Sequence, residues 1–141
     1  MEKQIPFKII ELEKSSFHFV VKGKVNGTKV LFIIDTGASR TLIDKQFAKE
    51  LKKIELNNES PIATGLMAEQ IPVELLSIQS LKLGKFKFKN ITTLTADLTA
   101  INNVYHKLTG KQIGGLIGSD FLTEYVKSIN IAKKKLIIKN R

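Results

Sequence analysis

The chain lacks cysteine and tryptophan, and its 141 residues include only two histidines, His18 and His106. The absence of cysteine excludes disulfides, thiol nucleophiles and cysteine-based zinc sites. Two isolated histidines also disfavour a catalytic metal centre or a Ser-His-Asp triad, so we expect neither a metal nor another cofactor. His18 alternates with Phe17 and Phe19, which predicts that it lies on the solvent face of a strand.

Long apolar runs are also missing from the sequence. No segment approaches the roughly 20 apolar residues that a membrane-spanning helix needs, and residues 1–6 contain no apolar core of a secretory signal. We therefore expect no membrane span and a cytoplasmic protein, with an exported form that has lost its signal as the open alternative. The length predicts a single domain over residues 1–141 with a sizeable core.

Acidic residues are few relative to basic ones. The chain has 23 Lys and Arg against 13 Asp and Glu, which gives a net charge of +10. Arginine, the better reader of nucleic-acid bases, occurs only at positions 40 and 141. The lysines of residues 82–89 fit the solvated face of a strand. We therefore expect no specific nucleic-acid binding, although weak attraction to acidic partners agrees with the charge.

The pattern of apolar and β-branched residues predicts a mostly β fold. We expect strands at residues 5–12, 17–25, 28–35, 73–83, 86–97 and 116–117, and a closing hairpin of residues 126–131 and 136–139. Asn26-Gly27 predicts a tight hairpin turn, because both residues tolerate positive φ. This turn fixes the register of the strand that ends at Asp35.

Helical signals are fewer. Asp44 is a candidate N-cap for a helix with an apolar face of Phe47, Ala48, Leu51 and Ile54, and Ser119 is a candidate cap for a helix that ends at Tyr125. Residues 98–113 are ambiguous. Ala100, Val104 and Leu108 favour a short helix there, whereas Asn102-Asn103 and Thr109-Gly110 oppose it.

Residues 30–39, Val-Leu-Phe-Ile-Ile-Asp-Thr-Gly-Ala-Ser, are the most informative segment. Such an apolar strand belongs in a core, so its end delivers the Asp35 carboxylate to a buried or cleft position where ionisation is easily perturbed. A second block, residues 114–122, carries the apolar pair Leu116-Ile117 followed by Gly118.

Together the two blocks resemble the aspartic proteases, whose hallmark is two hydrophobic residues, Asp, Thr or Ser, Gly, and Ala or Ser, followed later by a hydrophobic-hydrophobic-Gly element. Their order and separation resemble those of single-domain, retropepsin-like members, and the abundance of Lys, Ile and Asn suggests a bacterial one. The resemblance implies a retropepsin-like half-barrel with one or two short helices.

The resemblance also assigns roles to the residues around Asp35. Thr36 would hydrogen-bond across a twofold axis, Gly37 would permit the turn and bring its N–H to the carboxylates, and Ala38 would allow close approach. Ser39 would donate to the Asp35 carboxylate or serve as a turn residue. Leu116, Ile117 and Gly118 would support the site from the core. Residues 62–71, which include Thr64, Gly65 and Leu66, would form a flap that binds the substrate.

This family hydrolyses peptides with two carboxylates, yet the chain has a single Asp-Thr-Gly. Neither Asp97 nor Asp120 reproduces the motif, and we expect Asp120 to accept helix N–H groups or to pair with Arg40. The resemblance therefore implies a homodimer in which two copies of Asp35 activate a water at the twofold axis. The substrate would be a peptide or an unfolded protein. The alternatives are a non-catalytic, peptide-binding dimer with the same fold and a Lys-rich β protein that binds nucleic acid.

Overall fold

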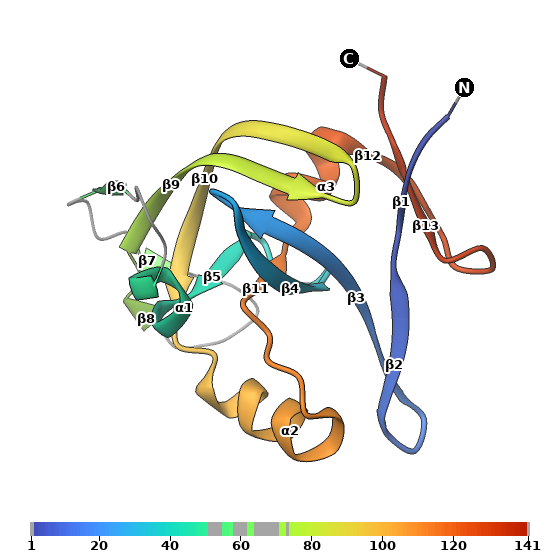
Figure 1. The fold of residues 1–141 in the computed structure, drawn as a ribbon, viewed down its shortest axis with the longest axis horizontal. Coiled ribbons are helices and arrows are strands. Elements are labelled where there is room, and N and C mark those ends of the chain that lie inside the picture. Colours follow the sequence, from blue (N-terminus) through green and yellow to red (C-terminus); the bar gives the residue numbers. More distant parts are fainter. Residues whose placement is uncertain (1, 51–54, 58–61, 64–70, 73, 141) are drawn as a thin grey trace.

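The computed structural model describes residues 2–50, 55–57, 62–63, 71–72 and 74–140 of the chain (Figure 1). Strands dominate, and three short helices, α1, α2 and α3, lie among them in this part of the chain. The elements in order are β1 (Lys3–Pro6), β2 (Lys8–Glu13), β3 (Ser16–Val25), β4 (Thr28–Ile34), β5 (Leu42–Asp44), α1 (Lys45–Glu50), β6 (Glu55–Asn57), β7 (Ile62–Ala63), β8 (Ile71–Pro72), β9 (Glu74–Leu83), β10 (Phe86–Ala96), α2 (Thr99–Thr109), β11 (Gly115–Ile117), α3 (Ser119–Tyr125), β12 (Val126–Asn130) and β13 (Lys135–Ile138).

The main sheet closes on itself. Its strand order is β2-β3-β4-β11-β5-β10-β9-β6, and an additional pairing of β3 with β9 joins strands that lie far apart in this order. Strands β3, β4, β11, β5, β10 and β9 therefore surround the core as a barrel (Figure 1). A separate sheet, β1-β13-β12, lies beside it and contains the first and last strands of the chain.

Strand β4 occupies the middle of this arrangement and is buried on both faces. Phe32 and Ile34 belong to the main core, whereas Ile33 belongs to a second apolar cluster that includes Tyr105 of α2. Burial on both faces explains why the sequence of β4 is continuously apolar rather than alternating. The strand is consequently fixed up to the residue before Asp35.

The Asn26-Gly27 turn is confirmed. The two residues have φ values of 48° and 87°, and β3 and β4 pair in antiparallel register from Val25 opposite Thr28 to Phe19 opposite Ile34. Positive φ at both central positions is what a two-residue hairpin requires. The turn thus sets which residues of β4 face the core and where the strand ends.

The expected first strand, residues 5–12, is two strands in two different sheets. β1 pairs with β13, whereas β2 pairs with β3. The chain changes sheets at Pro6 and Phe7, where proline has no N–H to continue a ladder. Phe7 is buried there and stacks on Phe19 with ring centroids 5.1 Å apart. The closing hairpin is confirmed as β12 and β13.

Helix α1 begins as expected after Asp44. One carboxylate oxygen of Asp44 accepts the Phe47 N–H at 3.3 Å, and the other accepts the Leu98 N–H at 2.9 Å. Asp44 is therefore an N-cap that also ties α1 to the segment entering α2. Ala48 is buried and Phe47 half-buried, while Leu51 and Ile54 lie outside the described residues.

Residues 98–113, which the sequence left ambiguous, contain a regular helix, α2 (Thr99–Thr109), but the apolar residues that favoured it do not form its buried face. Val104 and Leu108 are exposed, and Tyr105 is the fully buried side chain of the helix. The helix ends as the sequence suggests, since Gly110 adopts a left-handed φ of 71°. Asn102 stabilises the helix instead of opposing it: its side chain bonds both the N–H and the carbonyl of Ile113.

No helix in the described part of the chain has the length and apolar character needed to cross a membrane.

Candidate active site

Asp35 follows directly after β4 and lies at a tight turn. Its backbone N–H donates to the Ile117 carbonyl at 2.9 Å, and its own carbonyl accepts the Ala38 N–H at 3.1 Å. Carboxylate oxygen Oδ1 accepts the Gly37 N–H at 3.0 Å. The side chain is partly exposed, so one end of the carboxylate is held by the backbone while the group still meets solvent.

Gly37 brings its N–H to the Asp35 carboxylate as expected, but the turn does not depend on the conformational freedom of glycine. Its φ is not in the left-handed region, so the turn itself does not require glycine. A Cβ at Gly37 would lie 3.3 Å from Asp35 Oδ1. The missing side chain therefore leaves room for the carboxylate to reach the Gly37 N–H. Ser39 is exposed, and its backbone carbonyl accepts a hydrogen bond from the Ser119 hydroxyl at 3.4 Å.

The second sequence block lies against the Asp35 loop. β11 runs parallel to β4, with Leu116 opposite Ile33 and Ile117 opposite Ile34. Beyond it, the Ser119 N–H donates to the Ala38 carbonyl at 2.7 Å. A Cβ at Gly118 would lie 2.6 Å from the Arg40 carbonyl group and 2.8 Å from the Ala38 carbonyl oxygen. Only glycine therefore fits against this loop without displacing its backbone.

Thr41 is a supporting residue that the sequence analysis missed. It is 1% exposed, its hydroxyl donates to Asp120 Oδ1 at 2.8 Å, and the same hydroxyl accepts the Gly118 N–H at 3.1 Å. The Thr41 N–H donates to the same Asp120 oxygen at 2.9 Å. Thr41 thus fastens the end of the Asp35 loop to the start of α3. A threonine directly before an apolar strand carries no sequence signal for this role.

Asp120 has the structural role that was predicted for it. In addition to Thr41, its carboxylate accepts the Phe121 N–H at 2.7 Å at the start of α3, and Arg40 lies 3.5 Å away as an ion-pair partner. The expectation that Ser119 caps α3 is wrong. Gly118 is the N-cap residue, and Ser119 is the first residue of the helix. The acceptor at this helix start is the Asp120 carboxylate.

A hollow of about 330 Å³ lies beside Asp35. Most of its lining is apolar, from Ile33, Ile34, Leu116, Ile101 of α2 and other residues. Such a concave, largely apolar surface with a few polar groups is the usual form of a ligand site. The contribution of α2 could not be read from local sequence, because it depends on how that helix packs under the barrel.

His18 also lines this hollow, so its predicted solvent-facing position is wrong. It is partly buried, and its Nδ1 lies 2.6 Å from the Tyr105 hydroxyl oxygen. Burial raises the pKa of Tyr105 to about 12. The phenol therefore keeps its proton at neutral pH and can donate it to Nδ1. The alternation with phenylalanine misled the prediction because Phe17, not His18, is the exposed side chain.

The flap residues Thr64, Gly65 and Leu66 lie outside the described residues. On either side of them, β7 and β8 pair antiparallel, with Ala63 opposite Ile71. Thr36 is exposed at the Asp35 turn. No cluster of three or more histidine and acidic side chains in the described part of the chain could hold a metal ion.

Comparison with known proteins agrees with this geometry. The model of the aspartyl protease family matches residues 21–121, a span that contains both Asp35 and Gly118. The chain belongs to the aspartyl protease family. It is also 33% identical over 117 residues to the DNA damage-inducible protein 1 of Chaetomium globosum, a match that covers 82% of the chain but 23% of that relative. The chain therefore spans about a quarter of the length of this relative.

Solved structures show the same fold. A retropepsin-like aspartic protease from Rickettsia conorii aligns with a TM-score of 0.55 and 23% identity over 98% of this chain and 90% of its own. The EIAV protease complexed with the inhibitor HBY-793 aligns with a TM-score of 0.50 and 17% identity over 74% of this chain and 85% of its own. The retropepsin-like, mostly β fold class is thereby confirmed.

Proposed function

We propose that the protein is an aspartic endopeptidase that acts as a homodimer, with Asp35 of each copy as the catalytic carboxylate. The observation that carries the proposal is the position of Asp35: a partly exposed carboxylate, held by the Gly37 N–H, at the mouth of an apolar hollow. Asp44 and Asp120 are engaged in holding helix starts and loops. The exposed Thr36 and Gly37 leave the turn accessible to a second copy.

The proposed chemistry needs two carboxylates that share one proton. When two such groups are close, they do not both ionise easily, so one stays protonated and the other charged. The charged carboxylate takes a proton from a water held between them, and the water oxygen attacks the peptide carbonyl. The protonated carboxylate donates its proton to that carbonyl oxygen, which gives a tetrahedral intermediate. The proton taken from the water then passes to the peptide nitrogen, a hydroxyl of the intermediate returns its proton to the other carboxylate, and the C–N bond breaks to release the acid and the amine. No step of this scheme uses a metal.

The proposed substrate is a peptide or an unfolded protein that lies across the two hollows of the dimer. Ile33, Ile34 and Leu116 offer apolar contacts to a substrate side chain next to the scissile bond. In this proposal, residues 62–71, with Thr64, Gly65 and Leu66, close over the bound peptide. Ser39 and Ala38 support the turn.

The direct test is the Asp35→Asn variant. The amide keeps the shape of the carboxylate but loses the base, so we expect cleavage of an unfolded protein to be abolished while thermal stability and dimer content change little. A statine inhibitor should block the wild-type enzyme, and a chelator should have no effect. Retained cleavage in purified Asp35→Asn protein would refute the assignment. Peptide binding without cleavage by the wild-type protein would instead indicate the non-catalytic dimer.

The pH dependence offers a second test of the shared proton. The pair is competent only when it carries one proton, because the base and the acid must coexist. We expect kcat/KM to follow a bell-shaped profile with its maximum on the acidic side of neutral, measured from about pH 3 to pH 9 with dimer content checked at each point. A rate that climbs steadily into the alkaline range contradicts the scheme.

A further inference from the structure

Four lysines stand directly opposite one another across four neighbouring strands of the barrel. Lys29 of β4 is paired with Lys24 of β3, Lys24 is paired with Lys82 of β9, and Lys82 is paired with Lys87 of β10. All four side chains are exposed. Directly paired residues point to the same side of a sheet, so these four residues, named here the lysine ladder, form one row on the outside of the barrel.

The lysine ladder is unfavourable for the fold taken alone. Like charges directly opposite each other on paired strands are destabilising. Among the described side chains, no carboxylate lies within ion-pair distance of a ladder lysine. The ion pair that this part of the chain does contain joins Arg40 to Asp120, away from the ladder. Positions where a folded chain keeps an unfavourable local arrangement, such as facing like charges, without compensation from its own residues tend to be functional. A second copy of a chain with net charge +10 is on balance repelled by the ladder.

A hollow of about 690 Å³ lies next to the lysine ladder. Lys24, Lys29 and Lys82 line it together with the apolar side chains of Val30 and Phe47. This surface is separate from the Asp35 site, because Lys29 and Asp35 lie at opposite ends of β4, about 20 Å apart along an extended strand. A ligand that carries negative charges and an apolar group would find positive charge and apolar contact side by side on this surface.

We propose that the lysine ladder and its hollow bind an acidic, apolar-containing segment of a polypeptide, which would be a part of the substrate distant from the scissile bond. The identification of that polypeptide as substrate rests on the proposed protease function, whereas the binding itself does not. The apolar hollow favours a polypeptide over a nucleic acid, since a phosphodiester backbone has no side chain to place there. The ladder and the lining of its hollow contain no arginine, and the aromatic side chain in that lining, Phe47, is half-buried, so it offers bases little surface for stacking.

The test is fluorescence anisotropy with the Asp35→Asn protein, so that binding is measured without cleavage. The probes are a labelled Glu/Asp-rich peptide with one Phe, the same peptide with Gln and Asn in place of its acids, and the acidic peptide with Ala in place of Phe. Single- and double-stranded DNA oligonucleotides of equal negative charge complete the set. We expect the acidic Phe peptide to bind most tightly, and its affinity to fall as salt rises.

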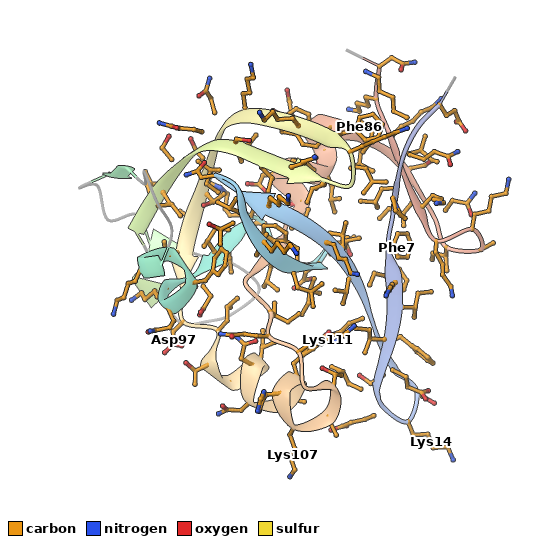
Figure 2. All side chains as sticks on the ribbon, viewed as in Figure 1. Phe7, Lys14, Phe86, Asp97, Lys107 and Lys111 are labelled. Atoms are coloured by element: carbon orange, nitrogen blue, oxygen red, sulfur yellow. The ribbon has the colours of Figure 1, made fainter. Side chains whose placement is uncertain are left out.

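The informative variant is Lys24→Gln/Lys82→Gln, and its matched control is Lys14→Gln/Lys107→Gln. Lys107 lies on α2 and Lys14 at the β2–β3 turn, whereas Phe86 marks the turn between β9 and β10 at the other end of the molecule (Figure 2). Both variants remove the same charge. We expect the ladder variant to bind the acidic peptide about tenfold more weakly at low salt, and the control less than about twofold more weakly.

A structural readout accompanies the binding. Loss of like-charge repulsion should leave the melting temperature of the ladder variant unchanged or raise it at low salt, so weaker binding cannot come from unfolding. The proposal is overturned by unchanged affinity in the ladder variant, by equal losses in both variants, or by tighter binding of either oligonucleotide than of the peptide. None of these results bears on whether Asp35 is catalytic, which the cleavage assay decides.

Discussion

Substitution of Gly118 by alanine tests how the Asp35 loop is held in place. The new Cβ would lie 2.6 Å from the Arg40 carbonyl group and 2.8 Å from the Ala38 carbonyl oxygen. These neighbours are backbone atoms of the loop, so relief requires the loop itself to move. Overpacking of this kind costs about 1–3 kcal/mol, which for a chain of this length lowers the melting temperature by about 3–10 °C.

The same movement should also reduce catalysis. A small misplacement of reacting groups is costly to the rate, so we expect kcat/KM to fall about 10- to 100-fold. Gly110→Ala is the matched control. Nothing lies within 4 Å of a Cβ there, but the φ of 71° makes alanine strained, and a left-handed alanine loses about 1–2 kcal/mol. This control should lose stability and keep its activity.

The assays are thermal unfolding and cleavage of an unfolded protein for both variants. If Gly118→Ala retained wild-type stability and activity, close approach of Gly118 would not be what positions the Asp35 loop. Equal losses of activity in both variants would mean that destabilisation alone lowers the rate.

Three further predictions concern the surroundings of the site. Asp120→Ala leaves the buried Thr41 N–H and hydroxyl without their acceptor, so urea unfolding should show a loss of about 1–3 kcal/mol, and an Asp120→Asn variant should lose less. Hydrogen bonds from the Thr99 hydroxyl and then its N–H hold the pKa of Asp97 below its usual value; Thr99→Ala should raise that pKa in an NMR titration. A carboxylate whose pKa is lower in the folded state stabilises the fold above its unfolded-state pKa, and this stabilisation is lost as the pH falls through its folded-state pKa. The variant should therefore be less stable than the wild type near neutral pH and equally stable in strong acid. Finally, specific activity should fall on dilution as the dimer dissociates, and a strictly monomeric, fully active chain in sedimentation would refute the dimer.

Local patterns were sufficient to predict the central strand and its carboxylate. The apolar run of β4 needs only its own residues to indicate burial, and Asn26-Gly27 encodes the turn that sets the register of the strand. For Gly118, the resemblance implied a position that gives space beside the Asp35 loop, and the structure places it against the Arg40 and Ala38 carbonyls. These features depend on neighbours in sequence or on a family resemblance carried by short motifs.

The missed features depend on contacts between distant segments. Ala100, Val104 and Leu108 have the spacing of an apolar helix face. The buried side chain of the helix is nevertheless Tyr105, whose hydroxyl contacts His18 of β3, 87 positions away. Thr41 matters because Asp120, 79 positions away, lies next to it. Closure of the barrel by β3 and β9 is of the same kind, because the alternation within a strand indicates its buried face but not which remote strand pairs with it.

The most direct test of the central claim is cleavage activity in mixtures of wild-type and Asp35→Asn chains, equilibrated so that dimers exchange partners at constant total concentration. If each active site needs Asp35 from both copies, mixed dimers are inactive and activity falls with the square of the wild-type fraction. An equal mixture would then retain about a quarter of the activity of the undiluted wild type. A linear decline to about half would show that each Asp35 acts independently, and retention of about three quarters would show that one Asp35 per dimer suffices; either result would contradict the shared active site.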